Sequence, residues 1–329
     1  MKGVAPPRPD APQSIGGDAI SWQASLLNFL SRHAIKRRVE RRGLSTGTAR
    51  TVVRLLELLT AGFGGMAPVR RLRVAGVDCD VVYPLNPPPE ERVILYLHGG
   101  GFFVHLPRSY KRFARRLAEA CGATVYLPAY RLAPEHRYPA ATDDCLAVYG
   151  ALLLDGCDPR RMSVMGDSAG GNLALVTLLR ARDAGLPLPC CASVLSPGAD
   201  LTMSGESFVG NAKADPFIPV EALREVVRLY VNAERTSEPH VSPMLADLHG
   251  LPPLEIVVGS TEVLLDSSLG TADACRAAGV TVELRVWHRM PHVFPLFSYL
   301  PEGRIALGQM AAFFLKHCTP GARAPNGES

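Results

Sequence analysis

One segment of this chain constrains its fold more than any other. Residues 166–172 read GDSAGGN, follow an apolar run at 161–165 and precede a helix-like segment at 173–180. A serine on so tight a strand-to-helix turn requires small residues two positions before and after it, because a Cβ there would obstruct the backbone. Gly166 and Gly170 meet this requirement. The helix that begins there directs free amides and the positive end of its dipole at Ser168. We therefore predict that Ser168 is an exposed nucleophile suited to acyl transfer.

Composition and charge are those of an ordinary globular protein. The 329 residues are 47% hydrophobic and 20% charged, which allows a substantial core in one large α/β domain or in two ordinary ones. Much of the net charge of +4 comes from the basic segment 32–42, which we interpret as a solvated helix face. Contact with a nucleic acid or with an anionic membrane is the alternative, but no motif supports either, and no nucleic-acid partner is expected. The eight cysteines form no C-x-x-C pair and are predicted to be reduced and packed.

The two ends of the chain carry tail-like sequences. Residues 1–17 are rich in proline and glycine and lack the apolar core of a targeting segment, so we expect a disordered tail at 1–18. A second flexible tail is expected at 319–329. No run of about 18 uncharged apolar residues occurs, so we predict no membrane span. A cytoplasmic protein is the expectation that follows.

Between the tails, a helical region precedes an alternating one. Two apolar stripes with helical spacing lie within 19–59, one formed by Trp22, Leu26, Phe29 and Leu30 and the other by Val52, Leu55, Leu56 and Leu59. From residue 70, β-rich runs alternate with amphipathic segments. The predicted strands are 70–74, 80–83, 93–98, 124–127, 162–165, 192–195, 254–258 and 282–287, and the predicted helices are 110–120, 140–154, 172–184, 268–278 and 305–317. This order predicts the α/β class, with a mostly parallel sheet covered on both faces. The interval 198–252, with a helix-like stretch at 220–231, is predicted to form part of a lid.

A second motif follows the apolar run 93–97. Residues 98–102 read HGGGF, a pattern known from the oxyanion loops of lipases and esterases. Without side chains, the Gly99 and Gly100 amides can approach a substrate oxygen and, together with the Ala169 amide, bind developing negative charge. Three glycines alone could form a mere flexible turn, but their position after a buried strand and ahead of the Ser168 turn favours the oxyanion loop.

A serine nucleophile needs a histidine to accept its proton and an acid to orient that histidine. We select His292, which follows the predicted strand ending at Trp287 and lies downstream of Ser168. His288 is spaced from His292 like a helical metal pair, but Pro291 argues against a helix, and no metal site is predicted. For the acid, Glu262 lies nearest the end of strand 254–258 and is preferred. Asp266 is interpreted as the cap of a helix starting near Ser267 and remains the alternative.

These motifs together resemble those of the bacterial hormone-sensitive-lipase-like (family IV) esterases of the α/β-hydrolase fold. The resemblance spans about residues 70–317 and also includes the sequence YRLAPE at 130–135. The family's acid is usually Asp in a D-x-L-x-D pattern; here Glu262 takes the first acidic position and Asp266 the second. His105 stands where relatives commonly have glycine. The resemblance implies an eight-stranded, mostly parallel sheet with helices on both faces and a helical cap. The implied domains are a cap segment at 19–65 and a catalytic domain at 66–318, with a cap insertion at about 198–252.

The same resemblance implies a serine carboxylesterase that acts through an acyl-enzyme, with no cofactor. The 7% content of aromatic residues and the modest length of the insertion favour small to medium-chain esters. The predicted partner is thus a small-molecule ester, and the predicted substrate contacts are Phe102, Phe103, Asp167 and Val293. Asp167 is also expected to brace the turn, and Arg131 and Glu135 to form a structural ion-pair network. An amidase, a lactonase or a transacylase would use the same residues, whereas a non-catalytic receptor of this fold is disfavoured by the presence of His292. Relatives often dimerise through the last strand and helix, here about 282–316.

Overall fold

The computed structural model describes residues 13–15, 19–43, 46–60 and 69–318 of the chain. Its centre is one nine-stranded sheet in the order β1-β9-β8-β7-β6-β4-β5-β3-β2. Every neighbouring pair is parallel except β2–β3 and β3–β5, which are antiparallel. The strands are β1 (Gln13–Ile15), β2 (Val69–Val74), β3 (Val77–Val82), β4 (Val93–Leu97), β5 (Thr124–Pro128), β6 (Met162–Asp167), β7 (Cys191–Leu195), β8 (Leu254–Gly259) and β9 (Val282–Trp287). The predicted fold class is confirmed.

The ninth strand corrects the prediction of a disordered tail for residues 13–15. The rest of the tail predicted at 1–18 and the tail predicted at 319–329 lie outside the residues that the structure describes. β1 pairs in parallel with β9, with Gln13 opposite Arg285 and Ile15 opposite Trp287. A sheet edge presents unpaired N–H and C=O groups, and three residues of backbone suffice to pair with them whatever their composition. Dimerisation through the surface at 282–316 stays a prediction. On that surface, β9 already pairs with β1 of the same chain.

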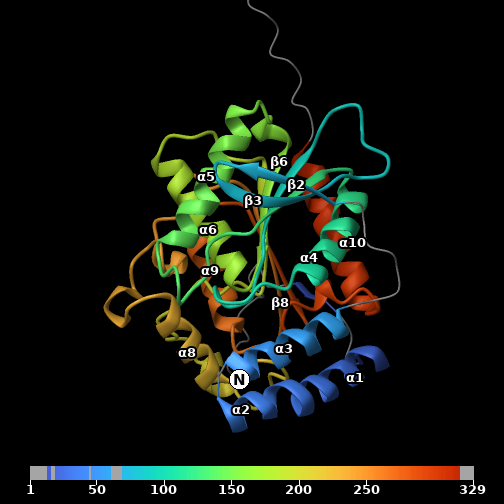
Figure 1. Cartoon of the computed structure of the whole chain (residues 1–329), viewed down its shortest axis with the longest axis vertical. Coiled ribbons are helices and arrows are strands. Elements are labelled where there is room, and N and C mark those ends of the chain that lie inside the picture. Colours follow the sequence, from blue (N-terminus) through green and yellow to red (C-terminus); the bar gives the residue numbers. More distant parts are fainter. Residues whose placement is uncertain (1–12, 16–18, 44–45, 61–68, 319–329) are drawn as a thin grey trace, which may run out of the picture.

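Helices cover both faces of the sheet, as the alternation predicts. Figure 1 shows the sheet nearly edge-on, with α5 (Ala140–Leu154), α6 (Ala169–Asp183) and α9 (Leu265–Ala277) on one side, and α4 (Pro107–Cys121) and α10 (Pro301–His317) on the other. All residues of β4, β6, β7 and β8 are buried. The sequences of these strands are largely apolar because both of their faces pack against helices.

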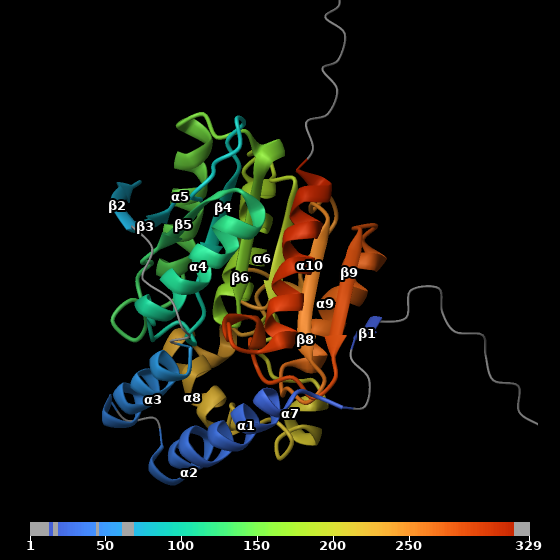
Figure 2. The ribbon, with the colours of Figure 1, turned by 90° about the vertical axis from the view of Figure 1, so that its right-hand side faces the viewer.

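The carboxyl end of the sheet is covered by segments from two distant parts of the sequence. Residues 22–42 form a helical rod made of α1 (Trp22–Leu30), a π-helical stretch η1 (Ser31–Lys36) and α2 (Arg37–Arg42), and α3 (Thr46–Leu59) follows it. The 198–252 interval supplies α7 (Ser207–Gly210) and α8 (Val220–Tyr230), the latter at the predicted helix. Figure 2 shows both groups at the same end of the molecule.

Polar contacts from Lys36 and Arg32 join these two groups. The ammonium group of Lys36 is buried and donates to the Asp215 carbonyl at 2.7 Å and to the Ala212 carbonyl, and Arg32 donates to the Ala214 carbonyl at 2.9 Å. Burial lowers the pKa of Lys36, although the nearby Asp215 and Glu40 charges oppose the effect. The rod is therefore held to the insertion by carbonyl acceptors, which satisfy the donors without neutralising their charge.

Candidate active site

The Ser168 turn has the geometry that its glycines predict. β6 ends at Asp167 and α6 begins at Ala169, and Ser168 between them has φ 53° and ψ −119°, a strained conformation for a residue with a side chain. A Cβ on Gly170 would run into the carbonyl oxygens of Leu97 and His98. The tight packing of this turn against the end of β4 therefore requires glycine, and it leaves Ser168 partly exposed.

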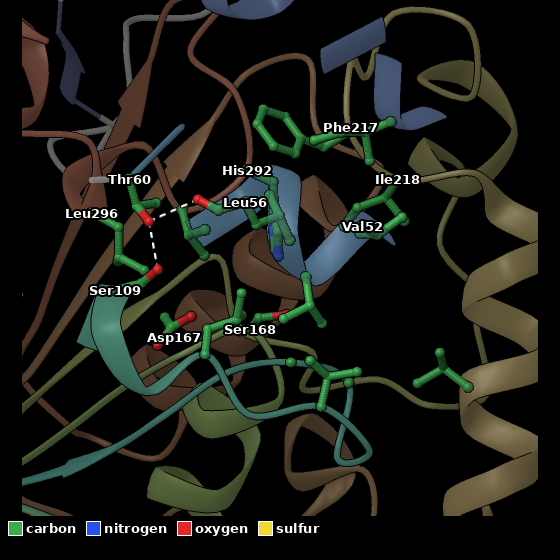
Figure 3. Close-up of a pocket in the computed structure, with 18 of the residues that line it drawn as sticks. Val52, Leu56, Thr60, Ser109, Asp167, Ser168, Phe217, Ile218, His292 and Leu296 are labelled. Carbon is green, nitrogen blue, oxygen red and sulfur yellow. Dashed lines mark hydrogen bonds between the residues drawn. The ribbon is translucent and has the colours of Figure 1, made fainter. Parts of the chain in front are cut away.

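His292 and Glu262 meet at the carboxyl ends of β8 and β9. The distance from His292 Nδ1 to Glu262 Oε2 is 2.6 Å, and Glu262 is fully buried. The other carboxylate oxygen, Oε1, accepts from the Gly259 amide at 2.6 Å and from Ser196 Oγ at 2.8 Å. These contacts fix the orientation of the Glu262 carboxylate, so that Oε2 faces His292. Figure 3 shows the His292 ring directed toward Ser168, and both residues line the same cavity.

Asp266, the alternative acid, lies elsewhere. Its Oδ2 accepts from the Ser207 amide at 2.8 Å, so it holds α7 against the start of α9. The predicted capping role is wrong, because α9 begins at Leu265, and Asp266 consequently lies inside the first turn. The described residues, which include His288 and His292, contain no group of three or more His, Cys, Asp or Glu side chains able to hold a metal ion.

The environment of His292 has opposing effects on its pKa. Burial alone would lower the pKa of this imidazole, because it disfavours the charged form. The hydrogen bond and the charge of Glu262, assisted by Asp215 and Asp167, outweigh burial, and the pKa is raised above 6.5. The site therefore stabilises an imidazolium, which is the form that a general base assumes after it has accepted a proton.

Asp167 braces the turn, as predicted. Its carboxylate accepts from Tyr96 Oη at 2.8 Å, from Tyr110 Oη at 2.9 Å and from the Gly99 amide at 3.0 Å. Burial nevertheless raises the pKa of Asp167 to about 6. The two tyrosines were missed by the sequence reasoning, since Tyr96 lies in an apolar strand and Tyr110 in a helix without any motif. The only available signal was a hydroxyl-bearing residue within the otherwise aliphatic run of β4.

The contact from Gly99 corrects the predicted oxyanion loop. The Gly99 amide points at Asp167 and at Tyr110 Oη, so it is not directed at a substrate. Gly100 and Gly101, with φ of 112° and 62°, line the cavity beside Ser168 instead. Within the described part of the chain, no group accepts a hydrogen bond from either of their amides. Gly101 is the residue that the sequence reasoning missed, because the motif alone does not say which of three consecutive amides turns toward the serine.

His98 holds this loop from behind. Its Nδ1 lies 2.7 Å from the Gly99 carbonyl, and Tyr130 Oη donates to the His98 carbonyl at 2.6 Å. Burial lowers the pKa of His98 to about 3, so the ring is neutral and Nδ1 carries the proton that it donates. The His98 ring also stacks on His105, with ring centroids 4.3 Å apart. His105 thus packs behind the loop.

The 130–135 turn is held by a different ion pair from the one predicted. Arg131 makes a two-pronged contact with Asp144 of α5, with distances of 2.7 to 3.0 Å, while Glu135 is exposed. The prediction that Glu135 would take part in this network is wrong. Two residues in a tight turn direct their side chains apart, whereas α5 presents Asp144 directly to the guanidinium.

Two cavities meet at Ser168. The larger, of about 220 Å³, is almost entirely apolar and extends under the rod, α3 and α8. Its lining includes Ile35, Val39, Val52, Leu56, Phe103, Asp167, Phe217, Leu223, Val226 and Val293, and Thr60 and Ser109 form a hydrogen bond in its wall (Figure 3). The smaller, of about 20 Å³, is lined by Gly101, Phe102, Ala169, Leu201 and Met203 among others. All four predicted substrate contacts therefore lie in the wall of one cavity or the other.

Comparison with known proteins places this geometry in a family. Residues 94–296 match the model of the alpha/beta hydrolase fold. The chain belongs to the α/β-hydrolase family. It is 40% identical over 229 residues to an acetyl-hydrolase of Streptomyces hygroscopicus, covering 69% of this chain and 76% of that protein. It is 35% identical over 247 residues to an esterase of Acinetobacter venetianus, covering 74% of this chain and 81% of that protein.

A solved structure narrows the assignment within the α/β-hydrolases. An esterase from the bacterial hormone-sensitive lipase family superposes with a TM-score of 0.83 at 36% identity, covering 92% of this chain and all of that one. The resemblance inferred from the motifs is thereby confirmed, and this α/β-hydrolase belongs to the hormone-sensitive-lipase branch. Among its described residues, none of the helices combines the length and the apolarity needed to cross a bilayer.

Proposed function

We propose that this protein is a serine carboxylesterase in which Ser168 is the nucleophile, His292 the general base and Glu262 the acid that orients it. The observation that carries the proposal is the 2.6 Å contact between His292 Nδ1 and Glu262 Oε2, beside a strained Ser168 in the same cavity wall. Membership of the hormone-sensitive-lipase branch supports it, since the similar proteins named above are esterases or acetyl-hydrolases.

The first half-reaction forms an acyl-enzyme. Ser168 Oγ attacks the ester carbonyl carbon while its proton passes to His292 Nε2, and Glu262 stabilises the imidazolium through Nδ1–H. The carbonyl oxygen becomes an oxyanion that accepts from the amides of Gly100, Gly101 and Ala169. The carbon–oxygen bond to the alcohol then breaks, and His292 returns the proton to the leaving alkoxide.

The second half-reaction regenerates the enzyme. A water molecule gives its proton to His292 and attacks the acyl carbon, and the same amides hold the second oxyanion. The ester bond to Ser168 Oγ breaks as His292 protonates it, and the carboxylic acid leaves. Each proton and each bond is thereby accounted for without a metal or an organic cofactor.

The two cavities support a small to medium-sized ester as substrate. The volume of about 220 Å³ lies below the roughly 300–1,000 Å³ of pockets that hold drug-sized ligands, and its lining favours hydrocarbon. The cavity of about 20 Å³ on the other side of Ser168 suits a group of one or two carbons. One side of the ester is therefore proposed to be short and the other longer and apolar.

The test is hydrolysis of p-nitrophenyl esters from acetate to palmitate, by the wild type and by Ser168→Ala. We expect turnover to be highest on short chains and to fall by about three or more orders of magnitude in the variant. Ser237→Ala, at an exposed serine, is the matched control and should behave as wild type. Absence of wild-type turnover on every chain, or turnover that survives in Ser168→Ala, would overturn the proposal.

A further inference from the structure

The rod at 22–42 presents large apolar side chains to solvent. Trp22 is 72% exposed, Phe29 58%, Leu26 46% and Leu30 40%. Their spacing places them on one face of the helix. The opposite face supplies Ala24, Leu27, Ile35 and Val39, which are buried. A helix on a protein surface usually directs polar residues outward, so an exposed apolar stripe of this size indicates an interaction surface.

The position of the rod leaves this stripe accessible. Figures 1 and 2 both show α1 and α2 at one end of the molecule, beyond α3 and α8. We name the exposed stripe, together with the arginines that follow it, the outer cap face; it consists of Trp22, Leu26, Phe29, Leu30, Arg37, Arg41 and Arg42.

Positive charge is concentrated on the same rod. Residues 22–42 contain six Lys or Arg and one acidic residue, Glu40, a net charge of +5, whereas the whole chain has +4. The remainder of the chain is thus slightly negative. Arg37, Arg41 and Arg42 are exposed, and within the described ranges none of them forms an ion pair with a carboxylate. Their charge is available to a partner.

We propose that the outer cap face docks this protein on the surface of an anionic lipid membrane. Apolar and aromatic side chains beside unpaired cations are the combination that binds at the boundary between headgroups and acyl chains. A second copy of the chain would bring two rods of net charge +5 together, which disfavours self-association through this face. A nucleic acid would attract the arginines but would leave the apolar stripe without a partner.

Docking at this face brings the cavity close to the lipid. Ile35 and Val39, on the inner side of the rod, line the cavity of about 220 Å³, so one helix separates the outer cap face from the substrate site. The docking itself does not depend on the proposed ester hydrolysis. A failure to bind vesicles and a failure to hydrolyse esters are therefore separate results.

The fluorescence of Trp22 can report the binding of this face to lipid. Of its two tryptophans, Trp22 lies in the outer cap face and Trp287 is buried with 2% exposure. Vesicles of phosphatidylcholine with 30% phosphatidylglycerol should therefore shift the Trp22 emission to the blue and carry the protein upward in a flotation gradient. Pure phosphatidylcholine vesicles should bind it at least tenfold more weakly, and about 1 M salt should abolish the difference.

Two variants separate the apolar from the electrostatic contribution. Leu26→Ser/Phe29→Ser keeps the Trp22 reporter and should weaken binding at least tenfold. Each cation near an anionic membrane strengthens binding about fivefold. Arg37→Gln/Arg41→Gln/Arg42→Gln removes three cations and should therefore weaken binding roughly a hundredfold. The matched controls are Leu85→Ser/Leu154→Ser, at other exposed leucines, and Arg70→Gln/Arg71→Gln/Arg73→Gln on β2, which removes the same charge.

Both controls should bind vesicles within about twofold of wild type, and thermal unfolding midpoints should show that all four variants are folded. Equal binding by the outer-cap variants and their controls would overturn the proposal. So would a concentration-dependent dimer, seen by light scattering, that Leu26→Ser/Phe29→Ser abolishes while vesicles leave the Trp22 emission unchanged. In that case a second copy would be the occupant.

Discussion

In Glu262→Gln the side-chain amide nitrogen is forced to face His292. The Gly259 amide and Ser196 Oγ both donate to Oε1, at 2.6 and 2.8 Å, and these two donors require an oxygen on that side. The NH₂ group of the glutamine therefore takes the place of Oε2, which lies 2.6 Å from His292 Nδ1. A donor now faces Nδ1, so the imidazole must carry its proton on Nε2.

This tautomer blocks the proposed mechanism. With a proton on Nε2, His292 cannot accept the proton of Ser168, and kcat should fall by about 10⁴-fold, as when the acid of another Ser-His-acid triad is replaced by its amide. This loss corresponds to about 5 kcal/mol of activation free energy. The acidic limb of the pH–activity profile should also move to lower pH, because burial, which lowers the pKa of His292, would no longer be opposed by the Glu262 charge.

The assay is steady-state hydrolysis of p-nitrophenyl butyrate between pH 4 and 9, with Asp266→Asn as the control. Both changes replace a carboxylate by an amide. Glu262 lies in the loop between β8 and α9, and Asp266 lies in the first turn of α9. Because Asp266 contacts Ser207 and not His292, Asp266→Asn should keep kcat within about tenfold while losing roughly 1–3 kcal/mol of unfolding free energy. The reasoning is refuted if Glu262→Gln turns over at a rate near wild type, or if Asp266→Asn is the variant that loses activity.

Three further outcomes are expected. Wild-type activity should fall as the pH drops through a value above 6.5, because the raised pKa of His292 leaves it protonated there, and full activity at pH 5 would contradict the assignment. Tyr110→Phe removes one of the three donors to Asp167 and should cost about 1–3 kcal/mol in urea unfolding, whereas Tyr83→Phe, at an exposed tyrosine, should cost almost nothing. Gly170→Ala should be destabilised by several kcal/mol or fail to fold, since its Cβ meets two carbonyl oxygens. Gly308→Ala in α10, where a Cβ meets nothing within 4 Å, should be neutral or more stable, and equal unfolding midpoints for the two would show that the turn can relax.

Much of this protein could be predicted from local patterns. The alternation of apolar runs predicted the eight strands from β2 to β9, because side-chain periodicity and burial are properties of short segments. The glycines around Ser168 and the position of His292 after a strand predicted which residues would face each other. Parallel strands bring their carboxyl ends to one edge of the sheet, so these predictions needed only the order of the elements.

Other features depended on contacts between distant segments. Sequence spacing left both Glu262 and Asp266 as candidate acids, and only the fold shows that Glu262 contacts His292 whereas Asp266 contacts Ser207. The motif predicts that the Gly99 amide faces a substrate oxygen, but Tyr96 and Tyr110, from a strand and a helix, surround Asp167, and the Gly99 amide donates to its carboxylate. Hydrogen bonds discriminate over fractions of an ångström, which sequence spacing does not resolve.

The apolar stripe of Trp22, Leu26 and Phe29 illustrates the same division. Its spacing by itself determined a helix with one continuous apolar side. Only the tertiary structure decided that the smaller residues on the other side, such as Ala24 and Leu27, are the ones buried, and that the stripe faces outward. Periodicity belongs to a single helix, whereas the face that a helix buries depends on the shape of the elements that it packs against.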